Sequence, residues 1–208
     1  MKIIIFKICF FLFFISNNIF SQIAVSIVRA PSYLSLRDDI NKEYQVEITN
    51  SDTVNYLLYN ITDPYISMGN LCCNSDVINN SAAFSWVKVF DAKQKIILDY
   101  TKRREIYASA YLPQNIEDSG EMKAYYRSCI NDKLILKSKE KICFNFKLNI
   151  ANLNIKTGTY FIQYLYTNGS NLKMFVDKDV LIRDEMLFNA KVFYGCIQSN
   201  SFELRIKK

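Results

Sequence analysis

The sequence contains no histidine, and its 208 residues include only five glycines and three prolines. Without an imidazole, the chain cannot build a Ser-His-Asp triad or a Cys-His pair, because both use histidine as the general base. The glycine-rich phosphate-binding patterns G-x-x-x-x-G-K-S/T and G-x-G-x-x-G are absent as well. No stretch rich in Pro or Gly marks a linker, so we expect residues 23–208 to form one domain.

The other catalytic patterns in the sequence stand in unfavourable contexts. The letters S-x-x-K occur at Ser138 to Lys141, but this segment is typical of a hairpin turn rather than of the start of a helix. The acid pairs Asp38-Asp39 and Glu117-Asp118 lie in polar turns, whereas a glycosidase needs two carboxylates that face one cleft. The adjacent Cys72-Cys73 lacks the C-x-x-C spacing of a zinc site. We therefore expect a protein that is not an enzyme, with no metal and no cofactor.

Basic residues outnumber acidic ones, giving a formal net charge of +6, but they are spread along the chain. The only basic cluster is Lys102-Arg103-Arg104, which is followed by Glu105. A nucleic-acid interface needs a denser basic patch with an aromatic or helical reading element. We expect no nucleic-acid partner.

The N-terminal segment has the composition of a signal peptide. Lys2 and Lys7 precede or interrupt an apolar run, which is followed by polar residues and the small Ser21. We assign residues 1–22 to the signal, with cleavage between Ser21 and Gln22. An uncleaved membrane anchor is the alternative, but Ile8 to Ile15 is far shorter than the roughly 20 apolar residues of a span. We expect a secreted or periplasmic product with no stable membrane span after the signal is removed.

Export would place the cysteines in an oxidising compartment, where disulfides persist. Five remain beyond the signal: Cys72, Cys73, Cys129, Cys143 and Cys196. Because the number is odd, at least one thiol is left over or pairs between chains. We favour a bridge from Cys72 or Cys73 to Cys129, because both segments have loop composition. Cys143 is then either the odd thiol or a partner of Cys196.

Alternation of apolar and polar residues predicts an all-β fold. Tyr44, Val46 and Ile48 alternate with polar residues, which indicates a strand with one buried face. After a turn at Asn50-Ser51-Asp52, we expect a second strand that pairs with the first one. Further strands are expected at Ile23–Val28, Tyr56–Tyr59, Trp86–Phe90 with Trp86 in the core, Ile142–Ile150, Tyr160–Tyr166, Val192–Ile197 and Phe202–Ile206.

Leu153, Gly158 and Tyr160 are spaced like a tyrosine corner, in which a tyrosine at the start of a strand hydrogen-bonds back to upstream backbone. Asn168-Gly169 predicts a tight turn after that strand. The segment Leu172 to Leu187 is compatible with either strand or helix.

Two long insertions interrupt the strands, at about 62–83 and 99–132. In the second one, Ile106 to Leu112 is expected as a strand that turns Tyr107 and Tyr111 to solvent. Glu121 to Arg127 is expected as a short helical turn that carries Tyr125 and Tyr126. Exposed tyrosines give contact area at low entropic cost, so we predict a binding surface at Tyr107, Tyr111, Tyr125 and Tyr126. Alternatively, the insertion covers a sheet edge.

The strand that ends at Asn50, the turn that starts at Leu136, the Gly158-Thr159-Tyr160 segment and the strand after Ser199-Asn200 together resemble bacterial immunoglobulin-like sandwich domains. The spacing is distantly similar to the bacterial intracellular proteinase-inhibitor type, over roughly residues 44–60 and 134–206. The chain departs from that type in its signal, its two insertions and the lack of Pro-Gly before the long strand. The resemblance implies a single antiparallel immunoglobulin-like β-sandwich with long loop insertions.

The sequence thus predicts an exported, non-catalytic binding protein that contacts a protein or a cell-surface component. A secreted inhibitor of an enzyme such as a protease is the alternative, although no inhibitory residue is carried over from the resemblance.

Overall fold

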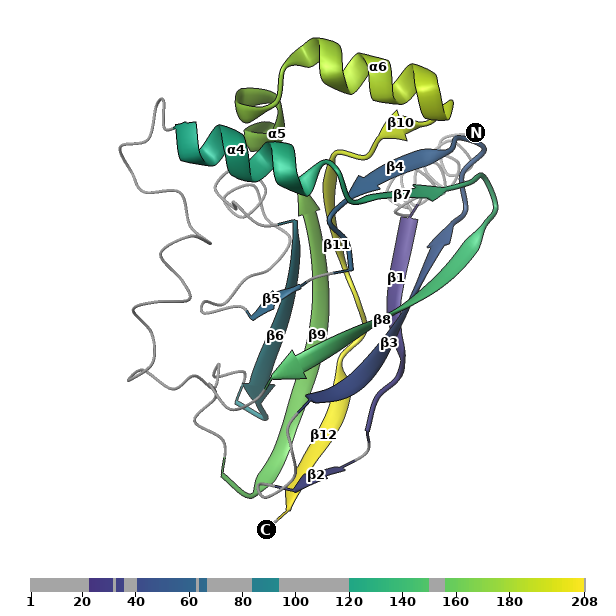
Figure 1. The fold of residues 1–208 in the computed structure, drawn as a ribbon. Helices are drawn as coiled ribbons and strands as arrows, with labels where there is room; N and C mark the ends of the chain where they lie inside the picture. The colour runs from purple at the N-terminus through teal and green to yellow at the C-terminus, as the bar shows by residue number, and fades with distance from the viewer. Residues whose placement is uncertain are drawn as a thin grey trace, which may run out of the picture.

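The computed structural model describes residues 23–31, 33–35, 41–62, 64–66, 84–93, 120–149 and 156–207. These residues form mostly strands, with helices at one end of the molecule (Figure 1). This confirms the expectation of a chain built mainly from strands. None of the helices in these ranges has the length and apolar character that crossing a bilayer requires.

The first sheet is antiparallel and has the order β1-β3-β8. Its strands are β1 (Ile23–Arg29), β3 (Asn41–Asn50) and β8 (Lys141–Asn149). The alternation seen in the sequence sets which face is buried, because Tyr44, Val46 and Ile48 of β3 are fully enclosed while their neighbours are half-exposed. The predicted strands at Ile23, Tyr44 and Ile142 are therefore confirmed.

The second sheet is larger, with the order β2-β12-β9-β6-β5 and with β11 also paired to β9. Its strands are β2 (Tyr33–Ser35), β12 (Phe202–Lys207), β9 (Gly158–Asn168), β6 (Ser85–Asp91), β5 (Tyr65–Ile66) and β11 (Gly195–Gln198). Trp86 on β6 is fully buried, as predicted. The pairs β2·β12 and β5·β6 are parallel and the others are antiparallel.

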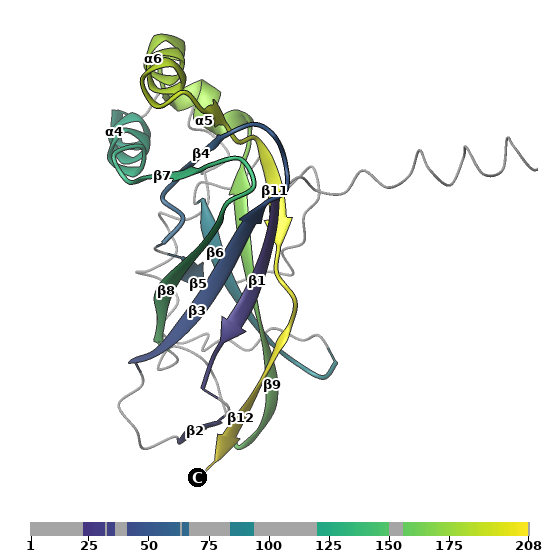
Figure 2. The same cartoon turned by 90° about the vertical axis from the view of Figure 1, so that its right-hand side faces the viewer.

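The two sheets face each other and enclose an aromatic core (Figure 2). Tyr44 of β3 stacks on Phe146 of β8, with ring centroids 5.2 Å apart. Across the interior, Tyr164 of β9 contacts Phe144 at 5.8 Å and Phe146 at 5.9 Å. Aromatic pairs at such distances contribute attraction beyond the area that they bury. The sheets are thus joined by contacts between residues far apart in the sequence.

A third, small sheet lies beside the helices and has the order β10-β4-β7. Its strands are β4 (Tyr56–Tyr59), β7 (Lys133–Leu136) and β10 (Lys191–Val192). The predicted pairing of β3 with β4 is wrong, because β4 pairs with β7 while β3 pairs with β8. The buried Asn50 explains the difference: its Nδ2 donates to the carbonyl oxygens of Val54 (2.7 Å) and Lys137 (2.9 Å). Because of these bonds, the chain passes from β3 into the small sheet and does not fold back to pair β4 with β3.

The predicted tyrosine hydrogen bond at the start of β9 is present. The hydroxyl of Tyr160 donates to the carbonyl of Lys156 (3.0 Å) and accepts from the amide of the same residue (3.2 Å). Leu153, which was also part of the pattern, lies outside the described residues. These hydrogen bonds join two residues that are four positions apart, and they fix the conformation of the chain where it enters β9, the central strand of the second sheet.

The helices are α4 (Gly120–Cys129), α5 (Ser170–Phe175) and α6 (Lys178–Phe188). The helical turn predicted at Glu121–Arg127 is confirmed as part of α4, and Leu172 to Leu187 forms two helices. The tight turn predicted at Asn168-Gly169 is wrong, because Gly169 is the N-cap residue of α5. Asn168 is buried and its Nδ2 donates to the carbonyl of Phe193 (2.6 Å), so it holds the segment between β10 and β11 instead of making a hairpin.

Candidate binding surface on α6

Helix α6 buries an acidic residue. Asp184 is 2% exposed, and its Oδ2 lies 2.9 Å from the Nζ of Lys133 on β7. The hydroxyl of Tyr59 on β4 donates to the same oxygen at 3.1 Å. Burial and the adjacent carboxylate both raise the pKa of Tyr59, so its phenol stays protonated and keeps donating. A buried carboxylate is costly unless it is paired, and here an ammonium and a phenol partner it.

Large apolar side chains of α6 point away from the buried side that carries Leu181 and Asp184. Ile182 is 41% exposed, Met186 is 78% exposed and Leu187 is 71% exposed. Ile182 and Met186 are four residues apart and lie on one face of the helix, and Leu187 lines the same hollow on the outer side of α6 as both of them. We call this set, Ile182, Met186 and Leu187, the α6 ridge. A helix usually buries its apolar residues and exposes its acids, and α6 does the opposite at these positions.

The C-terminal end of α6 is fixed to the small sheet. The Oε1 of Glu185 accepts from the amide of Val192 on β10 at 2.9 Å. The Nδ2 of Asn55 donates to the carbonyl of Asn189 at 3.0 Å, and the amide of Lys191 donates to the carbonyl of Asn55 at 2.9 Å. The α6 ridge is therefore presented by a helix whose position is set by hydrogen bonds to β4 and β10.

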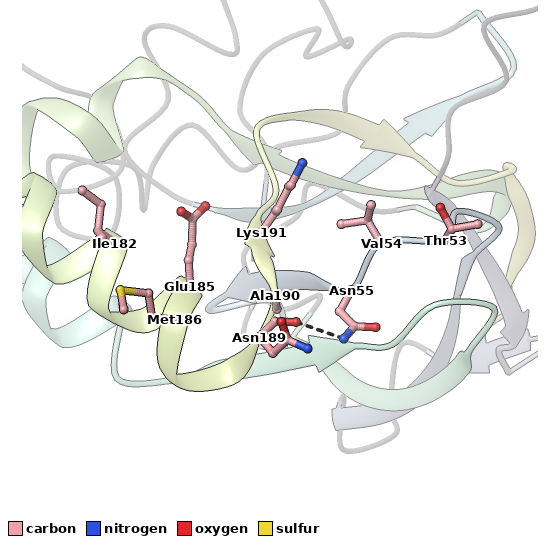
Figure 3. A pocket seen from close by; sticks show the side chains of 9 residues that line it. All are labelled: Thr53, Val54, Asn55, Ile182, Glu185, Met186, Asn189, Ala190 and Lys191. Carbon is pink, nitrogen blue, oxygen red and sulfur yellow. Dashed lines mark hydrogen bonds between the residues drawn. The ribbon is translucent and has the colours of Figure 1, made fainter.

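Concave surfaces border the α6 ridge. Figure 3 shows a cavity of about 460 Å³ between α6, the segment before β4 and residues 189–191. A second cavity of about 360 Å³ lies between α5, α6 and Tyr194, and a third of about 430 Å³ lies along the outer side of α6. Ile182 lines all of them. The ridge and its flanking cavities form an uneven surface, which can accept the protruding side chains of a binding partner.

The rim of this surface is basic. Its exposed cationic residues are Lys173, Lys178, Arg183 and Lys191. The acidic residues beside them are Asp177, Asp179 and Glu185. Asp177 lies 4.0 Å from Arg127, and Glu185 accepts a hydrogen bond from a backbone amide. The ammonium of Lys173 lies 4.3 Å from the ring centroid of Tyr194, which is 39% exposed. Partial burial, with Glu185 nearby, raises the pKa of Tyr194, so it is a neutral phenol at physiological pH.

Of the four tyrosines predicted as a binding surface, Tyr126 has a side chain that the structure describes. Tyr126 is 2% exposed and packs between Phe84 (ring centroids 5.6 Å apart) and Phe175 (5.1 Å), so its assignment to the surface is wrong. It faces inward because α4 lies against α5 and uses Tyr126 as its core residue. Tyr107, Tyr111 and the side chain of Tyr125 lie outside the described residues.

The cysteines differ from the predicted pairing. Cys129 is a buried thiol whose Sγ accepts from the Nδ2 of Asn60 at 3.5 Å, so the expected bridge from Cys72 or Cys73 to Cys129 is wrong. It lies on the inner side of α4, not in a loop that needs tethering. Cys143 is an exposed thiol on β8, on the polar face where its alternation placed it. Cys196 takes part in a disulfide, and Cys72 and Cys73 lie outside the described residues.

Sequence reasoning missed the α6 ridge because the segment Val180 to Phe188 is apolar on several sides. The pattern contained one signal, the acid Asp184 between apolar neighbours. Which side of the helix is buried depends on Lys133, a residue that precedes it by about fifty positions and cannot be paired with it by periodicity. In the described ranges, no group of three or more His, Cys, Asp or Glu residues is arranged to hold a metal ion.

No protein-family model matches this chain, and no curated protein matches it. Among solved structures, the chain is similar to a mutant β-glucosidase from Listeria innocua in complex with laminaribiose. The identity is 9% and the TM-score is 0.36. The match covers 91% of this chain but 16% of that enzyme, so the chain spans about a sixth of the enzyme's length. A match at this level carries no argument about function.

Proposed function

We propose that this protein is an exported, non-catalytic binding protein that captures a protein partner through the α6 ridge. The proposal rests on the burial pattern of α6, because this helix buries the acidic Asp184 and exposes the apolar Ile182, Met186 and Leu187. Contiguous exposed apolar side chains with a polar rim mark interaction sites in soluble proteins. Enclosing such side chains at an interface contributes up to about 1.5–3 kcal/mol for each one that is fully buried.

A protein partner fits the surface better than a lipid bilayer does. A membrane-surface helix presents a flat apolar face that lies in the plane of the headgroups. The α6 ridge is bordered instead by cavities of about 460 and 360 Å³, which the side chains of a partner protein can fill. Interfaces draw most of their affinity from a few anchors seated in such pockets.

The N-terminal segment that ends at Ser21 acts as the signal, and the mature chain is secreted or periplasmic. The Tyr160 corner and the face-to-face sheets support an immunoglobulin-like sandwich as the frame that carries the helices. N-terminal sequencing of the exported protein should start at Gln22.

The test is capture of exported proteins from the source cells by the purified mature chain. Met186→Glu and Leu187→Glu place a charge on the ridge, and Val28→Glu places the same charge on another exposed apolar residue, which is on β1 and 46% exposed. A captured protein is then produced separately, and its dissociation constant is measured with each variant. We expect the two ridge variants to weaken binding at least about tenfold, equivalent to 1.4 kcal/mol, while Val28→Glu binds like the wild type.

Equal binding by all of these variants would overturn the proposal. Circular dichroism and thermal unfolding of each variant distinguish loss of the contact from loss of the fold. If the captured protein is a protease whose activity falls on binding, the inhibitor alternative is the correct form of the binding function.

A further inference from the structure

The cavity between α5 and α6 combines an apolar floor with a basic rim. It is lined by Leu181, Ile182, Glu185, Tyr194, Lys173 and Lys178, and its volume is about 360 Å³. Leu181 is 6% exposed, so the floor is part of the core, whereas both lysines are exposed. This volume accepts one or two aliphatic side chains of a partner but no folded element.

The lining of this cavity carries two lysines and one acid, so its formal charge is positive. Lys173 lies over the ring of Tyr194, and no ion pair joins Lys173 or Lys178 to an acid of the described residues. The acid of the cavity, Glu185, directs its Oε1 at the amide of Val192. Two ammonium groups beside an apolar pocket therefore present unmatched donors to whatever enters it.

From this arrangement we infer that the partner contacts the surface with an acidic amphipathic helix. One aliphatic side chain of that helix occupies the cavity, and a carboxylate one turn away binds Lys173 or Lys178. Residues four apart on a helix lie on the same face, so this spacing places an aliphatic group and a carboxylate side by side. The remaining apolar residues of the partner helix pack along the α6 ridge. The inference rests on the proposed function and specifies the chemistry of its partner.

A second copy of this chain and an anionic bilayer are the other candidate occupants of this surface, and both fit it less well. A second copy of this chain would bring the same lysines and Arg183 against the rim, and like charges repel at close range. An anionic bilayer would satisfy the lysines but would leave the cavity on the α5 side of the ridge unfilled. The partner that satisfies both the cavity and the charge is an acidic protein segment.

The experiment uses two synthetic amphipathic peptides of about 15 residues, long enough for four helical turns. Both carry the same leucine stripe, and their polar positions are glutamate in one and lysine in the other. Binding of each labelled peptide to the mature protein is measured by fluorescence anisotropy at low and high salt. We expect the glutamate peptide to bind at least about tenfold more tightly than the lysine peptide, with a preference that shrinks as salt screens the charges.

Variants of the lysines that line the cavity test whether the preference for the glutamate peptide arises there. Lys173→Glu combined with Lys178→Glu should reverse the preference between the two peptides. The control Lys93→Glu changes an exposed lysine at the end of β6, remote from the helices, and should leave the preference unchanged. Met186→Ser should weaken both peptides alike, because it removes an apolar contact that both of them make and adds no charge.

Each other outcome overturns the inference. Equal binding of the two peptides, or a preference that survives the double lysine variant, removes the acidic helix as occupant. Lysine-dependent sedimentation with phosphatidylglycerol vesicles and no peptide preference assigns the surface to lipid. A dimer in sedimentation velocity that Met186→Glu dissociates assigns it to a second copy. If neither peptide binds while a captured protein still depends on Met186, the inference fails and the proposed function stands.

Discussion

The carboxylate of Asp184 on α6 and the ammonium of Lys133 on β7 lie 2.9 Å apart beneath the helix. The same ammonium is 5.5 Å from the ring centroid of Phe188, one turn further along α6. This pair links the helical end of the molecule to the small sheet. Together with the buried Leu181 it forms the inner side of α6, and Ile182, Met186 and Leu187 are exposed.

Asp184→Ala should destabilise the protein by about 2–3 kcal/mol, near the lower limit for breaking a buried ion pair. The lower value is expected because the side chain of Lys133 is 23% exposed and can rehydrate in part. The hydroxyl of Tyr59 loses its acceptor in the same variant. The measurement is urea unfolding followed by circular dichroism.

The matched control is Asp179→Ala on the exposed side of the same helix, which should cost less than about 1 kcal/mol through the helix dipole. Replacing both charges, with Asp184→Leu and Lys133→Met, should recover part of the lost stability. If Asp179→Ala and Asp184→Ala cost the same, the buried pair does not anchor α6.

Tyr160→Phe should lower the free energy of unfolding by about 1 kcal/mol, because it removes both hydrogen bonds to the backbone of Lys156. The control is Tyr33→Phe on β2, a tyrosine that is 56% exposed, and it should change stability by less than about 0.5 kcal/mol. No difference between the two variants would contradict a structural role for the corner.

Alkaline pH should unfold the protein through its buried tyrosines. Burial raises the pKa values of Tyr44, Tyr59, Tyr164 and Tyr166 above the ordinary value of 10.0. The unfolded chain therefore loses phenolic protons first, so the stabilising contribution is complete below about pH 10 and is lost as pH rises further. Absorbance of tyrosinate should increase together with the loss of β-type circular dichroism. Ionisation of these phenols without unfolding would contradict the burial.

Tyr44 offers a separate test of the same core. Its hydroxyl is buried and has no hydrogen-bond partner among the described residues. Tyr44→Phe removes a polar group whose desolvation is not compensated, so stability should be unchanged or higher by up to about 1–2 kcal/mol. The stacking on Phe146 is kept in this variant. Urea unfolding at neutral pH measures the effect, and a clear loss of stability would contradict it.

The described thiols should differ in reactivity. Cys143 is exposed on β8, whereas Cys129 is 7% exposed and is hydrogen-bonded by Asn60. Alkylation with iodoacetamide under native conditions should therefore modify Cys143 and should modify Cys129 only after unfolding. Peptide mass spectrometry gives the extent at each site. Equal native modification of both would show that α4 opens readily.

The parts of the fold that were predictable are those fixed by local pattern. Alternation at Tyr44, Val46 and Ile48 defines a buried face without knowledge of the partner strand. The corner at Tyr160 closes within four residues, so its spacing is visible in the sequence. Turns that depend on distant groups were not predictable, since Asn50 and Asn168 are turn formers by composition but here bind Lys137 and Phe193.

The candidate site was the least predictable part. The tyrosine hypothesis assumed that Tyr126 faces solvent, and its burial depends on Phe84 and Phe175, which come from two other segments of the chain. The α6 ridge required the Asp184–Lys133 pair, a contact between α6 and β7 that no local periodicity encodes. Exposure decides where a binding surface lies, and exposure is a property of the assembled fold.

In the proposed function, the exposed apolar side of α6 contacts a protein partner. The most direct measurement places a photo-crosslinking amino acid at position 186 of the mature chain, and in a control at position 28, before exposure to the exported proteins of the source cells. We expect a defined protein adduct from position 186, suppressed by the glutamate peptide, and none from position 28. The same adducts from both positions, or no adduct from position 186, would contradict it.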